Sequence, residues 1–174
     1  MIDNLNFIYP EIFISLSIMF LLLLGVFKKK SNSLVYNLSI IFLIFTLALI
    51  FNYPLQSNIN LFNGSYEINF FSSFMKILTI SSGSFVLIAS SRYLKIFKIF
   101  QIEYSILLLS SILGMMVMIS SNDLIVFYIG LELQSLSLYV LASFNRDQIK
   151  SSESGLKYFI LSALSSGLFY MDAL

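Results

Sequence analysis

The sequence contains no cysteine and no histidine, and these two absences exclude several kinds of chemistry. Without cysteine the chain can form no disulfide and supply no thiolate to zinc or to an iron–sulfur cluster. Without histidine it lacks a common ligand of haem iron and zinc. It also lacks a glycine-rich phosphate loop and a nucleophile–base pair. We therefore expect this chain to bind no metal and no cofactor, and any chemistry to be the movement of a proton or another ion.

Charged residues are scarce as well. They make up 11% of the 174 residues, whereas 58% are hydrophobic. This composition is far more apolar than a soluble domain requires and is typical of an integral membrane protein. The net charge is only +1 and the basic residues occur in short groups, so we expect membrane lipids around the chain and no nucleic-acid partner.

The hydrophobic residues form six runs, each about as long as the 17–25 residues of a membrane-spanning helix. The predicted fold is therefore all-α, a polytopic membrane bundle of six transmembrane helices that forms one integral-membrane domain over residues 1–174. The longest connection, at 52–69, should be irregular because it contains Pro54, Asn63 and Gly64. We expect the helices at about 8–27, 34–51, 70–91, 104–120, 124–144 and 156–174.

The basic residues predict the orientation of the helices. Loops rich in lysine and arginine stay on the cytoplasmic or matrix side of a membrane. In an alternating arrangement of six helices, every basic group that flanks a helix lies on one side: Lys28, Lys29, Lys30, Arg92, Lys95, Lys98, Arg146, Lys150 and Lys157. Both ends of the chain are therefore expected on the opposite side.

Glu132 is the residue that points most directly to a function. It lies near the middle of the predicted helix 124–144, where its side chain cannot easily reach either interface. A charge at that depth costs at least a few kcal/mol, so an ionisable residue there is commonly functional. It shares one helix face with a polar stripe that should face other helices or water: Tyr128, Glu132, Ser135, Tyr139 and Ser143.

Two interpretations of Glu132 remain open at this stage. In the first, a protonated carboxyl group only forms a hydrogen bond to a neighbouring helix. In the second, the group carries protons, because burial favours the neutral form of a carboxyl group and a nearby cation favours the charged form. A group balanced between these two influences can take up and release a proton near neutral pH.

Two lysines are candidates for such a cation. Lys157 lies about one turn into the last predicted helix, and either it pairs with Glu153 at the interface or it modulates the charge of Glu132 from the adjacent helix. Lys76 lies roughly 9 Å into the third predicted helix, and either it extends to the interface or it faces the bundle. Glu11 begins the first helix and is expected at the interface.

Small residues predict where helices approach each other closely. Such residues are common in every polytopic protein, so they indicate bundling and no particular function. The candidates are Ser110-x-x-x-Gly114, Ala163-x-x-x-Gly167 and the run Ser81-Ser82-Gly83-Ser84.

The start of the sequence bears on where the protein is located. Met1 to Asn6 show neither the arginine-rich pattern of an organellar transit peptide nor a signal-peptide cleavage site, so synthesis beside the target membrane is expected. The abundance of Phe, Ile, Asn, Tyr and Lys is what AT-rich codons produce, which favours an organellar genome. We expect a multi-pass protein of the mitochondrial inner membrane with both termini on the intermembrane-space side, and the alternative is a bacterial plasma membrane.

The segment 121–167 closely resembles a known family. Its Glu-Leu-Gln-Ser-Leu core at 132–136 and its Gly-Leu-Lys-Tyr-Phe-Ile-Leu-Ser-Ala-Leu-Ser-Ser-Gly block at 155–167 are similar to the subunit 2 family of NADH dehydrogenase. These are antiporter-like membrane subunits of respiratory complex I. The start at Tyr9-Pro10-Glu11 and the Phe-x-x-Phe-x-Lys-x-Leu pattern at 71–78 agree more loosely. The resemblance favours the mitochondrial and alphaproteobacterial branch.

This resemblance implies proton translocation coupled to electron transfer from NADH to ubiquinone. Glu132 matches the family's fifth-helix glutamate, which works with a lysine on the seventh helix. NADH, FMN, iron–sulfur clusters and ubiquinone are then expected on other subunits, and no stand-alone activity is expected here. The family fold has inverted repeats at helices 4–8 and 9–13, and this chain resembles its first six helices.

Because the sequence ends at Leu174, it does not contain the seventh-helix lysine. We expect a split or shortened subunit, assembled with the other membrane-arm subunits of complex I and with a second chain that carries the missing C-terminal helices. Without that chain, the subunit would be structural and would not pump. A subunit of a multisubunit cation/proton antiporter, without an NADH partner, is the third interpretation.

Overall fold

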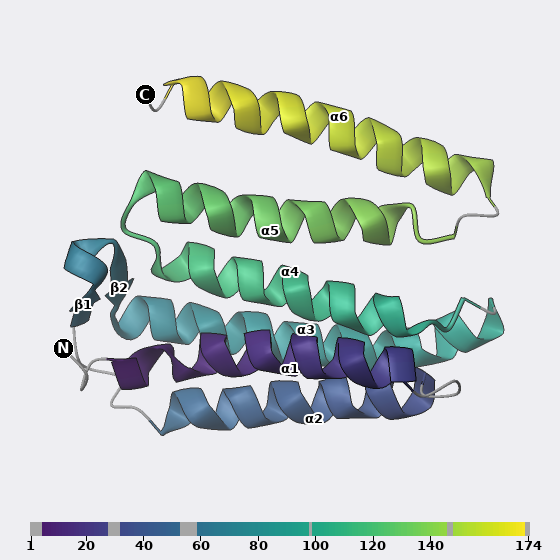
Figure 1. Ribbon diagram of the computed structural model, residues 1–174, viewed down its shortest axis with the longest axis horizontal. Helices are drawn as coiled ribbons and strands as arrows, with labels where there is room; N and C mark the ends of the chain where they lie inside the picture. The colour runs from purple at the N-terminus through teal and green to yellow at the C-terminus, as the bar shows by residue number, and fades with distance from the viewer. Residues whose placement is uncertain (1–4, 28–31, 53–58, 98, 146–147, 173–174) are drawn as a thin grey trace.

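The computed structural model describes residues 5–27, 32–52, 59–97, 99–145 and 148–172, and most of them lie in six α-helices. Successive helices run in alternating directions and pack side by side (Figure 1). The helices are α1 (Tyr9–Phe27), α2 (Asn32–Phe51), α3 (Phe70–Ile96), α4 (Ile102–Ser120), α5 (Leu124–Ala142) and α6 (Ile149–Asp172). The predicted all-α bundle of six helices is confirmed.

Helices α1 to α5 are long and apolar enough to cross a membrane. α6 is not among those five, and its first turns include Lys150, Glu153 and Lys157. The prediction placed the start of this helix at 156, whereas it begins at Ile149. Hydrophobicity marks only the apolar part of a helix, so the polar turns before that part were missed.

The core of the bundle lies among α1, α2, α3 and α4. α4 is central, because it packs against these three helices on one side and against α5 on the other. α6 lies at the edge of the molecule and packs against α5 (Figure 1). The largest side chains in the core are completely or almost completely buried, among them Leu21, Leu43, Ile80, Leu87, Leu109, Ile112 and Met116.

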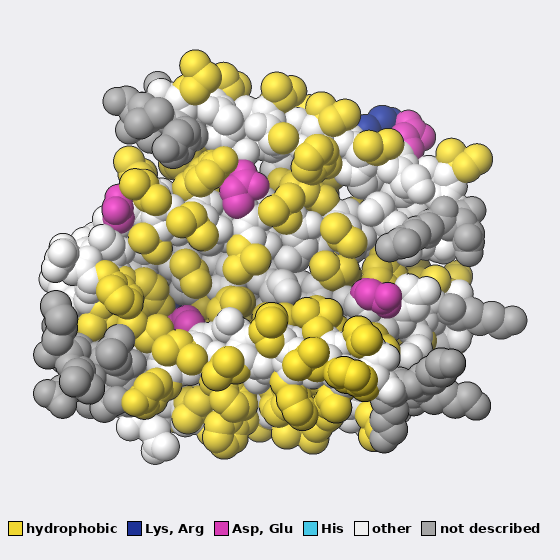
Figure 2. Space-filling model, in the orientation of Figure 1, with side chains coloured by type: hydrophobic (Ala, Val, Ile, Leu, Met, Phe, Trp, Pro, Cys, Tyr) yellow, Lys and Arg dark blue, Asp and Glu magenta, His cyan; other side chains and the backbone are white. Residues whose placement is uncertain are grey.

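The outer surface is also hydrophobic. Figure 2 shows hydrophobic side chains over most of the visible face, with only isolated charged groups between them. Large apolar side chains such as Leu16, Phe85 and Leu164 are exposed. A soluble monomer rarely exposes so much apolar surface, whereas hydrocarbon tails solvate it. The helices and this surface support a multi-pass membrane protein.

A small β-hairpin lies between α2 and α3, at the end of the bundle where α3 begins (Figure 1). Strands β1 (Ile59–Leu61) and β2 (Tyr66–Ile68) pair antiparallel. The turn contains Asn63 with φ 57° and Gly64 with φ 94°, conformations that these two residue types adopt more readily than most. An irregular connection was predicted for this segment, and the hairpin, which the Asn-Gly pair could have indicated, was not.

Glycines bring α4 and α5 into backbone contact. A Cβ atom added to Gly114 would lie 2.6 Å from the backbone nitrogen of Gln134 and 2.8 Å from the carbonyl oxygen of Gly130. The close approach predicted at Gly114 is confirmed, and Gly130 is the partner that was missed. Gly167 differs, because a Cβ there would meet no described atom within 4 Å.

The described charges are distributed as the orientation prediction requires. Arg92 and Lys95 lie near the end of α3, and Lys150 and Lys157 lie near the start of α6. These two helix ends lie at the same end of the bundle, opposite the hairpin (Figure 1). The other basic residues used in the prediction lie outside the described residues: Lys28, Lys29, Lys30, Lys98 and Arg146.

Candidate functional site

Glu132 lies close to the midpoint of α5, roughly 12 Å from the first residue of that helix at 1.5 Å per residue. The Asp123 side chain caps the start of α5 by accepting a hydrogen bond from the Ile125 backbone nitrogen at 3.4 Å. The Glu132 side chain is half-buried. Within the described parts of the chain, its carboxyl group has no hydrogen-bond or ion-pair partner. Among the described residues, the Glu132 carboxyl group is therefore unpaired at the middle of α5.

The polar stripe on α5 faces α6. The Tyr139 hydroxyl donates a hydrogen bond to Ser162 Oγ, and the Tyr139 ring packs edge-on against Tyr158 at 4.7 Å between centroids. A Cβ atom added to Gly155 of α6 would lie 2.5 Å from the Cβ of Ser143. The prediction that the stripe contacts another helix is confirmed at Tyr139 and Ser143. The other stripe members, Tyr128 and Ser135, are half-buried like Glu132.

Lys157 pairs with Glu153 on the exposed surface of α6. Its Nζ atom lies 2.5 Å from Glu153 Oε1, and the two side chains are 70% and 56% exposed. This is the pairing predicted from their spacing. Exposed pairs of this kind contribute little to stability. The alternative role of Lys157, modulating the charge of Glu132, stays a prediction.

Lys76 faces the inside of the bundle. Its side chain is 4% exposed, and its Nζ atom lies 2.6 Å from Oε1 of Glu11, which is itself 6% exposed. The interpretation in which Lys76 extends to the interface is wrong. Glu11 lies in the first turn of α1, at the end of the bundle, but its side chain is buried between helices. The reason is mutual: each charge provides the partner that makes burial of the other tolerable.

Tyr66 of the hairpin completes this buried group. Its hydroxyl donates a hydrogen bond to Glu11 Oε1 at 2.8 Å and accepts one from Lys76 Nζ at 3.2 Å. Burial raises the pKa of Tyr66, and the negative charge of Glu11 raises it further. We call Glu11, Tyr66 and Lys76 the hairpin-end cluster. The sequence analysis missed Tyr66, because only the hairpin places it between α1 and α3.

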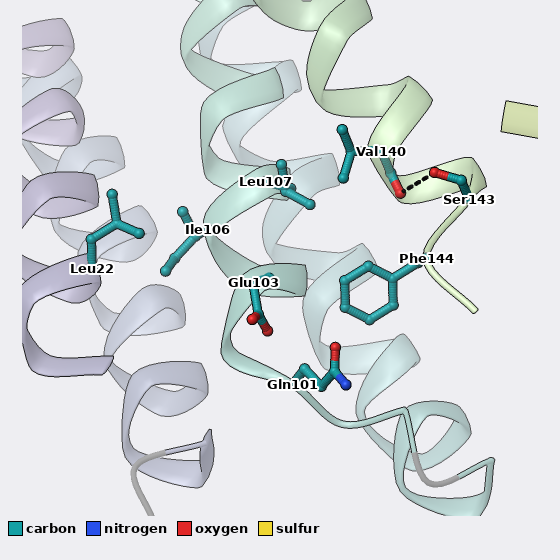
Figure 3. Close-up of a pocket in the computed structure, with 8 residues that line it drawn as sticks. All are labelled: Leu22, Gln101, Glu103, Ile106, Leu107, Val140, Ser143 and Phe144. Atoms are coloured by element: carbon teal, nitrogen blue, oxygen red, sulfur yellow. Dashed lines mark hydrogen bonds between the residues drawn. The ribbon is translucent and has the colours of Figure 1, made fainter. Parts of the chain in front are cut away.

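A pocket of about 250 Å³ lies at the opposite end of the bundle, between α1, α4 and α5. Figure 3 shows the polar groups of Gln101 and Glu103 at one side of this pocket, with the Ser143 hydroxyl and apolar side chains around the rest. Glu132 and the hairpin-end cluster do not line it. Its lining residues are Leu22, Gln101, Glu103, Ile106, Leu107, Val140, Ser143 and Phe144.

Comparison with known proteins gives a consistent result. Residues 121–173 match the family model described as NADH:quinone oxidoreductase/Mrp antiporter, TM. The chain is 76% identical over 166 residues to NADH-quinone oxidoreductase subunit N of Pelagibacter ubique, which covers 95% of this chain and 35% of that protein. It is 47% identical over 168 residues to subunit N of Bartonella bacilliformis, covering 96% of this chain and 34% of that protein.

Subunit N of Paramagnetospirillum magneticum is 40% identical over 161 residues, covering 92% of this chain and 33% of that protein. The chain therefore spans about a third of the length of the curated relatives that it matches. The motifs around Glu132, the helical membrane fold and these relatives agree. The chain belongs to the family of antiporter-like membrane subunits that includes NADH-quinone oxidoreductase subunit N.

Proposed function

We propose that this chain forms part of the membrane arm of an NADH-quinone oxidoreductase, complex I, and contributes to proton translocation through Glu132. Electron transfer from NADH to quinone takes place on other subunits, which hold NADH, FMN, the iron–sulfur clusters and the quinone. The chain itself has no redox role and no stand-alone activity. The names of its bacterial relatives support the assignment to this complex.

The observation that carries the proposal is the half-buried carboxyl group of Glu132 at the middle of α5, which has no partner among the described residues. In a medium of low polarity, such a group holds a proton until a cation or water approaches it. A cation that moves toward Glu132 therefore drives release of the proton, and its departure allows uptake of another. This cycle needs a mobile positive charge. Lys157 on the adjacent helix is one candidate for adjusting the charge of Glu132.

The principal cation is proposed to lie outside this sequence. The relatives are about three times as long as the chain, so the remainder of such a subunit, on the same polypeptide or on a second one, can supply it. The other membrane-arm subunits are the remaining proposed partners.

The proposed location is a bacterial plasma membrane, because the similar proteins named above come from bacteria. This is the alternative stated from the sequence. The mitochondrial inner membrane stays a prediction that the relatives do not support. In either membrane, the hairpin end of the bundle is proposed to face away from the cytoplasm or matrix.

A cation/proton antiporter is the second candidate function, because the description of the matching family model also names the Mrp antiporter. The relatives named as oxidoreductase subunits favour complex I over this candidate. NADH-driven activity separates the two, since an antiporter moves ions without oxidising NADH. Removing the Glu132 charge distinguishes a structural subunit from complex I pumping and from antiport, because only the two transporting functions need that charge.

The test is Glu132→Gln, introduced into the gene that encodes this chain. In inverted membrane vesicles, we expect NADH-driven proton uptake to fall severalfold, while NADH oxidation with an artificial electron acceptor stays at the wild-type level and reports intact assembly. Glu103→Gln, which removes an exposed carboxyl group from the first turn of α4, is the matched control and should pump normally. Wild-type proton uptake in Glu132→Gln would contradict the proposed role of Glu132.

A further inference from the structure

A second pair of opposite charges lies inside the bundle, away from Glu132. Glu11 of α1 and Lys76 of α3 are 2.6 Å apart, and both are more than nine-tenths buried. Breaking up such a pair is costly, but forming it usually adds little stability, because both charges must leave water. Stability alone therefore gives a weak reason for placing two charges here.

One oxygen of this pair has no partner. Glu11 Oε2 is fully buried and makes no hydrogen bond to any described residue. Tyr66 adjoins this oxygen, because its hydroxyl donates a hydrogen bond to Oε1 of the same carboxylate.

An orphaned carboxylate oxygen in a buried polar group is the kind of atom that ordered water satisfies. Buried polar groups are almost always hydrogen-bonded, and ordered water commonly satisfies those that the protein leaves free. A water beside Glu11 Oε2 has polar partners available in the carboxylate, the Lys76 ammonium group and the Tyr66 hydroxyl.

We propose that the hairpin-end cluster is a second ionisable site of this chain, at which Glu11 Oε2 takes up and releases a proton through a buried water. The proposal rests on the proposed function for its role in transport, but the site itself is independent of Glu132. On uptake, a hydronium ion gives its proton to Oε2 and leaves neutral water. Lys76 then carries an uncompensated positive charge until the proton departs.

Among the described residues, two titratable side chains contact Glu11 directly, those of Tyr66 and Lys76. Tyr66 keeps its proton because burial and the charge of Glu11 raise its pKa. Glu67 follows Tyr66 on β2, so it points to the other face of the hairpin, where its carboxylate accepts a hydrogen bond from Asn69 at 3.3 Å. Asp123 is exposed at the start of α5. Among the described charged groups, only Lys76 contacts Glu11 directly.

The hairpin joins this site to the helix that carries Glu132. The Asn122 backbone nitrogen donates a hydrogen bond to the Ser65 carbonyl at 3.0 Å, and its side chain donates one to the Gly64 carbonyl at 2.9 Å. The next residue, Asp123, caps α5. The site lies at the hairpin end of the bundle, which is proposed above to face away from the cytoplasm or matrix.

The decisive variant is the double substitution Glu11→Gln/Lys76→Met. It removes both charges together, so no unpaired charge stays buried, and Glu67→Gln is the matched control on the same hairpin. We expect the double variant to assemble, as measured with an artificial electron acceptor, but to show severalfold lower NADH-driven proton uptake. If it pumps like the wild type, the pair is only structural and the proposal is wrong.

Infrared difference spectroscopy across a pH titration gives a readout that does not depend on pumping. We expect the wild type to show a titrating carboxyl band that is absent from the double variant and shifted in Tyr66→Phe. Tyr66→Phe keeps both charges, so it tests the site even if the double variant does not accumulate. An unchanged spectrum in Tyr66→Phe would overturn the proposal. The band should persist in Glu132→Gln, so failure of the Glu132 role and failure of this site are distinguishable.

Discussion

At the scale of single residues, Tyr66 links the hairpin to the charge of Glu11. Its pKa is raised above the ordinary value of 10.0, so the folded protein retains the hydroxyl proton at pH values where the unfolded chain releases it. The contribution of Tyr66 to the free energy of unfolding is complete below pH 10.0, where the folded and unfolded chains both keep the hydroxyl proton. It declines as pH rises further, by about 1.4 kcal/mol for each pH unit until the folded-state pKa is reached.

Tyr66→Phe should therefore behave differently in the two pH ranges. Near neutral pH it is expected to be less stable than the wild type by about 1 kcal/mol, the usual contribution of one hydrogen bond. Above pH 10.0 the difference should shrink, because only the wild type must keep a proton that its unfolded state loses. Thermal unfolding of both proteins from neutral pH to about pH 11 tests this. A difference in Tm that stays constant would contradict it.

Single residues also show how a charge can be placed in two ways. Lys157 reaches the surface and pairs with a neighbour on its own helix, whereas Lys76 turns inward to Glu11 on another helix. Both lysines have the same flexible side chain and lie within a few turns of a helix start. The position of the carboxylate partner decides whether the lysine side chain turns into the bundle or toward the surface.

At the scale of helices, the contact between α4 and α5 depends on Gly114 and Gly130. Gly114→Ala places a methyl group 2.6 Å from a backbone nitrogen, so the helices must separate. We expect destabilisation of about 1–3 kcal/mol, as for other overpacked sites, and a lower Tm. Gly167→Ala is the matched control, since its methyl group meets no described atom within 4 Å. Equal Tm values for the two variants would refute the close packing of α4 on α5.

The ends of helices were harder to predict than their centres. α5 matches its predicted start at Leu124, where Asp123 provides a capping side chain. α6 has polar first turns, and its start was misplaced because a hydrophobic run gives no signal there. The hairpin was missed for a similar reason, since its two strands have only three residues each.

At the scale of the whole molecule, the absence of cysteine makes the orientation testable. Within these 174 residues, a single new cysteine gives a single site for a membrane-impermeant maleimide. Asn60→Cys in the hairpin and Gln148→Cys before α6 lie at exposed positions on opposite ends of the bundle. We expect labelling of Asn60→Cys only from the periplasmic side and of Gln148→Cys only from the cytoplasmic side. Labelling of both from one side of sealed vesicles would disprove the alternating arrangement.

The sequence by itself determined the membrane environment, the six helices and the polar face of α5 that includes Glu132. These features depend on composition and on periodicity within one segment, so neighbouring residues encode them fully. The Glu153–Lys157 pair belongs to the same group, because a spacing of four residues brings two side chains together on any helix.

Only the tertiary structure decided that Glu11, Tyr66 and Lys76 meet, and that Glu132 has no described partner. The three clustered residues come from α1, the hairpin and α3, and no local spacing encodes their contact. Their burial depends on the hairpin closing the end of the bundle beside α4. Packing between distant segments thus determines which charges are paired, and this pairing separates a structural ion pair from a group free to carry a proton.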